Sequence, residues 1–127
     1  MATRQLLLID DNKDNRALVK FALETYTNWE ISTASDGIEG ITKAELERPD
    51  VILLDLLMPG IDGLTIYKIL KSNLFTCTIS IIFITAMTQE KVLSRLETTL
   101  AEGIITKPFD VTNLNSQIAK ICEWEFS

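Results

Sequence analysis

The 127-residue sequence contains no histidine, only two cysteines and three prolines, and no long hydrophobic run. Without histidine the chain cannot build a Ser-His-Asp triad, an axial haem ligand of the usual kind or a histidine zinc site. The apolar run nearest its N-terminus, Leu6–Ile9, is too short for a signal-peptide core or a bilayer span. We therefore expect a cytoplasmic protein without membrane contact, in which Cys77 and Cys122 are reduced.

Basic residues are also few. Twelve Lys and Arg stand against 18 Asp and Glu, which gives a formal net charge of -6. Such a surface repels phosphate backbones, so we expect no nucleic-acid partner, although divalent cations and basic protein surfaces remain compatible with it. With 46% hydrophobic and 24% charged residues, the chain has the composition of a globular protein, and its length predicts a single domain over residues 1–127.

Short apolar runs alternate along the chain with segments of helical periodicity. The runs are Leu6–Ile9, a weaker one over Ile31–Ala34, Val51–Leu54, Ile79–Ile84 with Ser80 as its interruption, and the short Ile104–Ile105. Unbroken apolar runs, rather than alternating ones, predict strands that are covered on both faces. The order of the segments predicts an α/β, doubly wound (βα)5 fold, with a parallel sheet and helices on both faces.

Two features of the predicted helices can be compared directly with a structure. The first helix, over residues 14–27, has an apolar stripe at i, i+3, i+4 and i+7, made by Leu18, Phe21, Ala22 and Thr25. A fourth helix is predicted over residues 92–100. Asp36 and Asp110 stand where N-cap residues are expected.

Polar residues follow the predicted strands at the points where the strands end. Asp10 and Asp11 follow the first strand, Asp55 the third, Thr85 the fourth and Lys107 the fifth. The carboxyl ends of parallel strands share one edge of the sheet, where open α/β folds bind ligands. Three converging carboxylates repel one another unless a cation is present, and hard oxygen ligands favour Mg²⁺, which Mn²⁺ or Ca²⁺ could replace. A carboxylate can attack phosphorus to give an acyl phosphate, and a lysine ammonium suits a phosphoryl oxygen.

Four motifs occur in order, each at a strand end. They are Ile9-Asp10-Asp11-Asn12, the stretch LDLLMPGIDG over residues 54–63, Ile84-Thr85-Ala86 and Thr106-Lys107-Pro108-Phe109. With these motifs the sequence resembles, over essentially its whole length, the CheY-like receiver domain of response regulators in two-component signal transduction. The resemblance implies a flavodoxin-like fold with strand order 2-1-3-4-5.

The resemblance also implies a role for each site residue. Asp55 would accept a phosphoryl group from a histidine kinase or a histidine phosphotransfer protein. Mg²⁺ would be bound by Asp11 directly, by Asp10 through water, by Asp55, and by the backbone carbonyl of Leu57. Thr85 and Lys107 would hold the phosphoryl group, and the Lys107–Pro108 bond would be cis. Such a domain is a phosphoacceptor that switches a protein-binding surface, and it is not an enzyme acting on a separate substrate.

The sequence departs from the family pattern at several positions. Ile104 replaces the usual Tyr or Phe, so the readout by a rotating aromatic ring is expected to be altered. Leu100 stands where a Gly often ends the fourth helix. Leu57 and Met87, which flank the expected route of the hydrolytic water, are both apolar. We therefore predict a slowly hydrolysing acyl phosphate.

Other interpretations remain open at this point. The same residue types also suit a Mg²⁺-dependent phosphohydrolase with an aspartyl nucleophile, although here the acids are adjacent and the nucleophile would lie on the third strand. The chain could also be a receiver segment of a larger hybrid kinase, or a degenerate receiver that serves only as a scaffold. The output protein is not identified by the sequence, and a homodimer stays open.

Overall fold

The computed structural model describes residues 3–56, 58, 60, 62–86, 103–107, 110 and 112–124. Its strands form one parallel sheet in the order β2-β1-β3-β4-β5, which confirms the predicted strand order. The strands are β1 (Gln5–Ile9), β2 (Glu30–Ala34), β3 (Val51–Asp55), β4 (Ser80–Thr85) and β5 (Gly103–Thr106). The described helices are α1 (Lys13–Tyr26), α2 (Gly37–Glu47), α3 (Gly63–Lys71) and α5 (Leu114–Ile121). The helix predicted over residues 92–100 lies outside the described residues.

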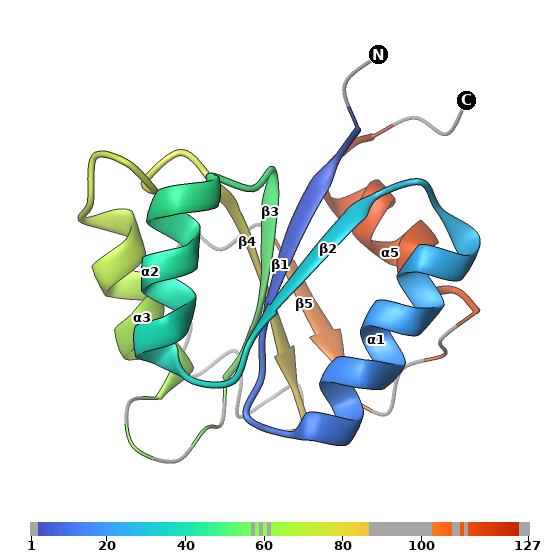
Figure 1. The fold of residues 1–127 in the computed structure, drawn as a ribbon, viewed down its shortest axis with the longest axis horizontal. Coiled ribbons are helices and arrows are strands. Elements are labelled where there is room, and N and C mark those ends of the chain that lie inside the picture. Colours follow the sequence, from blue (N-terminus) through green and yellow to red (C-terminus); the bar gives the residue numbers. More distant parts are fainter. Residues whose placement is uncertain are drawn as a thin grey trace.

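The sheet lies between two layers of helices (Figure 1). Helices α2 and α3 cover one face, and α1 and α5 cover the other. Successive residues of β1 serve the two layers in turn, because Leu7 and Ile9 belong to the core under α2 and α3, whereas Leu6 and Leu8 belong to the core under α1 and α5. Burial on both faces therefore explains the unbroken apolar runs and confirms the doubly wound α/β fold.

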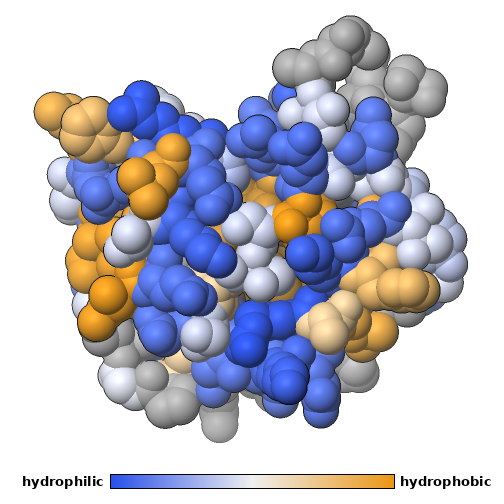
Figure 2. Space-filling model, viewed as in Figure 1, coloured by the Kyte–Doolittle hydropathy of each residue, from blue (hydrophilic) through white to orange (hydrophobic). Residues whose placement is uncertain are grey.

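The helix α1 forms as predicted, but of its predicted apolar stripe only Ala22 is buried, and the prediction is wrong for Leu18, Phe21 and Thr25. The buried residues of α1 are Val19, Ala22 and Leu23, whereas Phe21 is 70% exposed and Leu18 is 47% exposed. Figure 2 shows the resulting apolar surface over α1. Because α1 carries apolar residues on two adjacent faces, periodicity alone could not decide which of them packs on the sheet.

One of the two predicted N-caps is confirmed. The Asp36 carboxylate accepts a hydrogen bond of 2.8 Å from the backbone N–H of Glu39 and caps α2. The second prediction is wrong, because α5 follows Asn113 as its N-cap. Asp110 instead accepts hydrogen bonds from the backbone N–H of Thr112 at 2.9 Å and from its hydroxyl at 2.7 Å. A short Asp side chain readily bonds to a residue two positions on, and this local turn competes with capping.

An aromatic cluster lies at the amino ends of β1 and β2, where Arg4 and Trp29 precede these strands. Trp124, which follows α5, packs edge-on against Trp29 with ring centroids 5.2 Å apart. The guanidinium carbon of Arg4 lies 4.7 Å from the Trp124 ring centroid on the same cluster. Trp29 is only 8% exposed. We name Arg4, Trp29 and Trp124 the amino-edge cluster.

Among the described residues, the helices are all too short or too polar to span a membrane.

Candidate functional site

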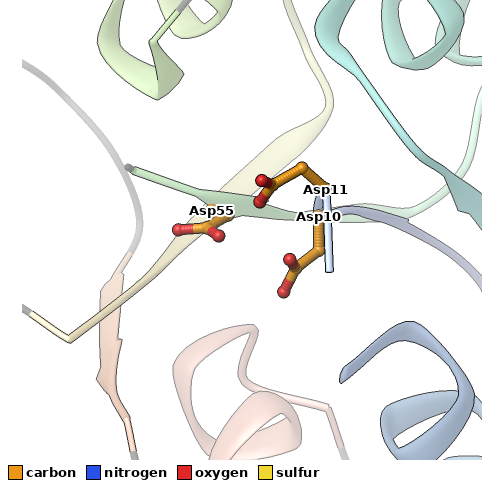
Figure 3. A group of neighbouring side chains, drawn as sticks. All are labelled: Asp10, Asp11 and Asp55. Carbon is orange, nitrogen blue, oxygen red and sulfur yellow. The ribbon is translucent and has the colours of Figure 1, made fainter. Parts of the chain in front are cut away.

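Three aspartates meet at the carboxyl edge of the sheet. Asp10 follows β1 and Asp55 ends β3, and the pairing of Ile9 with Leu54 places these two acids opposite each other on neighbouring strands. One carboxylate oxygen from each of Asp10, Asp11 and Asp55 lies within 4.8 Å of the others, and Figure 3 shows the side chains gathered at this edge. Asp10 and Asp55 are 1% and 5% exposed, whereas Asp11 is exposed. The structure therefore brings the three acids together, as the sequence predicts.

Lys107 provides a positive charge at the centre of this cluster. Its ammonium lies 3.3 Å from Oδ2 of Asp10 and 3.4 Å from Oδ2 of Asp55, so it bridges the two buried carboxylates. The side chain reaches them from beyond the end of β5, where the Lys107 backbone N–H donates to the Thr85 carbonyl at 2.8 Å. Because the lysine side chain is only 20% exposed, solvent screens this bridge less than it screens a surface ion pair.

Thr85 is placed at the same edge. It is the last residue of β4, fully buried, and lies in register with Thr106 on β5. Since β4 runs between β3 and β5, Thr85 lies on the strand between those that carry Asp55 and Lys107. Four residues that carry predictions lie outside the described residues, namely Leu57, Met87, Leu100 and Pro108. The binding of Mg²⁺ by the Leu57 carbonyl, the slow hydrolysis of the acyl phosphate, the altered end of the fourth helix and the cis Lys107–Pro108 bond therefore stay predictions.

Asp10 is held in place by all of its polar atoms. Its N–H donates to the Ala34 carbonyl at 3.1 Å, and its Oδ1 accepts from the Asn12 N–H at 2.9 Å. Its Oδ2 faces Lys107, as described above. Its backbone carbonyl accepts a hydrogen bond of 2.8 Å from Nη1 of Arg16, six residues later on α1. Sequence reasoning missed Arg16, for which the only signal was a basic residue in the first turns of the helix after the acidic pair.

Gly63 ends the motif over residues 54–63, but sequence reasoning gave it no role of its own. Its N–H donates to the Leu56 carbonyl at 3.1 Å, so α3 begins directly against the end of β3. A Cβ at this position would collide with the backbone carbonyl of Asp55. Only glycine lets the helix start so close to the candidate phosphoacceptor. The signal in the sequence was Asp62-Gly63, where Asp62 caps α3.

The donor set of this edge fits a hard divalent cation. Asp10, Asp11 and Asp55 each offer a carboxylate oxygen, which is the ligand type that Mg²⁺ prefers. Two of these acids are buried and share a single ammonium, that of Lys107, so the three carboxylates still carry an excess of negative charge that a divalent cation would neutralise.

Comparisons with known proteins agree with this geometry. Residues 6–119 match the model of the response regulator receiver domain. The chain is 36% identical over 117 residues to the transcriptional regulatory protein TrcR of Mycobacterium tuberculosis, covering 90% of this chain and 43% of that protein. It is 32% identical over 114 residues to the DNA-binding dual master transcriptional regulator RpaA of Synechocystis, covering 90% of this chain and 47% of the relative. It therefore spans less than half of each of these relatives.

A solved structure shows the same fold. The chemotaxis protein CheY4 of Vibrio cholerae superposes with a TM-score of 0.87 at 28% sequence identity, covering 94% of this chain and 99% of that one. The superposition covers nearly the whole doubly wound sheet and its helices. The chain therefore belongs to the response regulator receiver domain family.

Proposed function

We propose that Asp55 accepts a phosphoryl group from a phosphohistidine of a histidine kinase or a histidine phosphotransfer protein. The observation that carries this proposal is the bridge from Lys107 to Asp10 and Asp55 inside a cluster of three acids. A carboxylate oxygen of Asp55 attacks the phosphorus and forms the new P–O bond. The P–N bond to the donor imidazole breaks, and the imidazole nitrogen keeps the electron pair and is reprotonated. The product is an acyl phosphate on Asp55.

The surrounding residues neutralise and position the transferred group. Asp11 and Asp55 would hold Mg²⁺, with Asp10 acting through water, and the bound ion would supply positive charge against the phosphoryl oxygens. The Lys107 ammonium, which faces the Asp55 carboxylate at 3.4 Å, moves only a short way to pair with a phosphoryl oxygen. The buried Thr85 hydroxyl at the end of β4 donates a further hydrogen bond to it. These contacts favour one arrangement of the carboxyl-edge loops over another and so switch a protein-binding surface.

Intact-mass spectrometry after incubation with acetyl phosphate and Mg²⁺ tests the proposal. We expect one phosphoryl adduct in the native chain and none in Asp55→Asn. The matched control is Asp14→Asn, which removes an exposed acid from the first turn of α1 and should keep the adduct. A native chain without an adduct, or an adduct that survives Asp55→Asn, would contradict the assignment of Asp55.

We infer that the reaction ends at this chain and that no separate substrate is turned over. A phosphohydrolase of the aspartyl type would have its nucleophile and second acid two residues apart on the first strand, whereas here Asp10 and Asp11 are adjacent after β1 and Asp55 ends β3. Steady release of p-nitrophenol from p-nitrophenyl phosphate, lost in Asp55→Asn, would favour the hydrolase instead. We further propose that residues 1–127 form one receiver domain and that it works in the cytoplasm, where its kinase partner's phosphohistidine is available.

We propose that the output is a protein contact whose switching differs from the usual aromatic readout. Ile104 on β5 is half-buried and packs on the core under α2 and α3. A branched aliphatic side chain has no phenolic hydroxyl and no ring to reorient. Ile104→Tyr should leave phosphorylation of Asp55 intact and change the phosphorylation-dependent affinity for the output protein. Direct binding of nucleic acid by this chain would overturn the proposed protein output.

A further inference from the structure

We propose that Arg16 is a positioning residue of the metal site, which orients the Asp10–Asp11 peptide and thereby sets the affinity of the acidic cluster for Mg²⁺. The inference rests on the proposed binding of Mg²⁺ at Asp10, Asp11 and Asp55. It concerns a residue that touches neither the metal nor the phosphoryl group.

The first observation is a hydrogen bond that crosses the turn between β1 and α1. Nη1 of Arg16 donates to the backbone carbonyl of Asp10 at 2.8 Å. The carbonyl belongs to the peptide that links Asp10 to Asp11, so the bond fixes the plane from which both acidic side chains diverge. A charged donor makes this bond stronger than one between neutral groups.

The second observation is that Arg16 also builds the turn through its backbone. Its N–H donates to the Asn12 carbonyl at 3.0 Å, in the first turn of α1. The Asn12 side chain in turn caps the helix by accepting from the Asn15 N–H at 2.9 Å. The guanidinium of Arg16 is therefore carried by a rigid helical turn, and it holds the Asp10 carbonyl at a fixed place relative to α1.

The third observation is the difference between the two acids that this peptide joins. Asp10 is 1% exposed and held by its neighbours, whereas Asp11 is exposed. An exposed carboxylate keeps its rotamer freedom, so ordering it on metal binding costs side-chain entropy, and a mobile backbone would add to that cost. By fixing the peptide, Arg16 sets the direction in which the Asp11 side chain leaves the backbone, so that only its side-chain torsions remain to be ordered. Residues that orient metal ligands in this way typically change metal affinity when they are replaced.

Electrostatics and positioning predict opposite results for the loss of Arg16. If only the Coulomb repulsion between Arg16 and the metal ion matters, removing the positive charge of Arg16 should strengthen metal binding. If Arg16 positions the ligands, its removal should weaken binding. Lys20 provides the matched control, because it is an exposed cation on the same helix, about one turn further from the acids. Lys20→Met removes the same charge without touching the turn.

The experiment measures Mn²⁺ binding to the full chain by electron paramagnetic resonance of the free ion, with Mg²⁺ as competitor. We expect Arg16→Met to raise the dissociation constant by about tenfold or more. Arg16→Lys, which keeps a charged donor of similar reach, should recover part of the affinity. Lys20→Met should leave the dissociation constant unchanged or lower it slightly. If Arg16→Met does not fold, as judged by circular dichroism, Arg16→Lys alone carries the test and should still bind more weakly than the native chain.

A second readout separates positioning from a general loss of structure. The rate of acetyl phosphate labelling is measured as a function of Mg²⁺ concentration. We expect Arg16→Met to need more Mg²⁺ for half of its maximal rate and to reach a maximal rate close to the native one. An unchanged dissociation constant, an equal loss in Lys20→Met, or a fall in the maximal rate at saturating Mg²⁺ overturns the role of Arg16. A native chain that binds neither Mn²⁺ nor Mg²⁺ overturns the proposed metal site itself.

Discussion

The two ends of β1 are built in opposite ways. At its amino end, Arg4, Trp29 and Trp124 form the amino-edge cluster, in which aromatic rings pack edge to face under a guanidinium. At its carboxyl end, Asp10 lies with other acids around the ammonium of Lys107. The first end buries apolar area, which stabilises the fold. The second buries like charges, which costs stability.

The residues that stabilise the fold and the residues that carry the chemistry therefore lie at opposite ends of β1. The residues between the two ends on β1 and β3 are closely packed aliphatic side chains, which carry neither charge nor a hydrogen-bonding group from one end to the other. Substitutions at the amino edge should therefore change the free energy of unfolding without changing the reaction at Asp55. Substitutions at the carboxyl edge should change metal binding and phosphorylation more than stability.

The largest effect is expected at Trp29, which is 8% exposed in the core under α1 and α5. Trp29→Ala should lower the free energy of unfolding by about 3–5 kcal/mol, because it leaves a large cavity. Urea unfolding measures the loss. Trp29→Phe, which keeps a ring in the cluster, should lose less and keep the labelling rate of Asp55. A folded Trp29→Phe that is no longer labelled would break the separation between the two ends.

At the carboxyl edge, Lys107→Met should destabilise the metal-free chain. The substitution leaves Asp10 and Asp55 buried without their shared cation, and we expect a loss of about 2 kcal/mol, below the value for a fully buried pair. Mg²⁺ should recover more stability in this variant than in the native chain, because it supplies the missing positive charge. Thermal unfolding with and without Mg²⁺ measures both effects, with Lys20→Met as the exposed control. If Mg²⁺ stabilised Lys107→Met no more than it stabilises Lys20→Met and the native chain, the role given to Lys107 would be contradicted.

A smaller effect is expected for Arg4, which lies over the Trp124 ring at 4.7 Å. Arg4→Met keeps an apolar stem and removes the charge, so it should cost about 0.5–1 kcal/mol of stability. A double-mutant cycle with Trp124→Leu isolates the contact between the cation and the ring. A coupling energy of zero in that cycle would show that the guanidinium only lies near the ring and contributes nothing.

The smallest effect is expected at Asp110, on the carboxyl side of β5. Hydrogen bonds from the Thr112 hydroxyl and from its backbone N–H lower the pKa of this exposed carboxyl below its ordinary value. A lowered pKa means that the charged form is favoured in the folded chain, so this small contribution to stability is present above the ordinary pKa and is lost as the pH falls through the folded pKa. NMR titration should show the lowered pKa, and Thr112→Val should raise it. An Asp110 that titrates at the ordinary value in the native chain would contradict these bonds.

Much of the fold was predictable because its main signal is local. Each apolar run became a strand, and an unbroken run such as Val51–Leu54 in β3 is buried on both faces of the sheet. The weaker run in β2 is buried less completely, because Ser32 and Thr33 are half-buried. The packed face of α1 was not predictable in the same way, because Leu18 and Phe21 are as apolar as Val19 and Leu23. The path of the chain from β1 decides which of these pairs faces the sheet, and that path is a tertiary property.

The site was predictable to the extent that it follows from strand ends. Asp10, Asp55 and Lys107 converge because parallel strands place their carboxyl ends at one edge. Arg16 could not be inferred, because its partner is a backbone carbonyl, a group that every residue offers. The role of Gly63 could not be inferred for a related reason, because it consists in leaving room beside the Asp55 backbone where a side chain would collide.

The central claim is that the chemistry of this chain takes place at Asp55, at the carboxyl edge, and independently of the amino-edge cluster. The most direct test is to phosphorylate the chain, reduce the acyl phosphate with borohydride and locate the product by peptide mass spectrometry. The account predicts homoserine at position 55 alone, in the native chain and in Trp29→Phe alike. Homoserine at Asp10 or Asp11, or no modified residue after treatment with Mg²⁺ and phosphodonor, would contradict it.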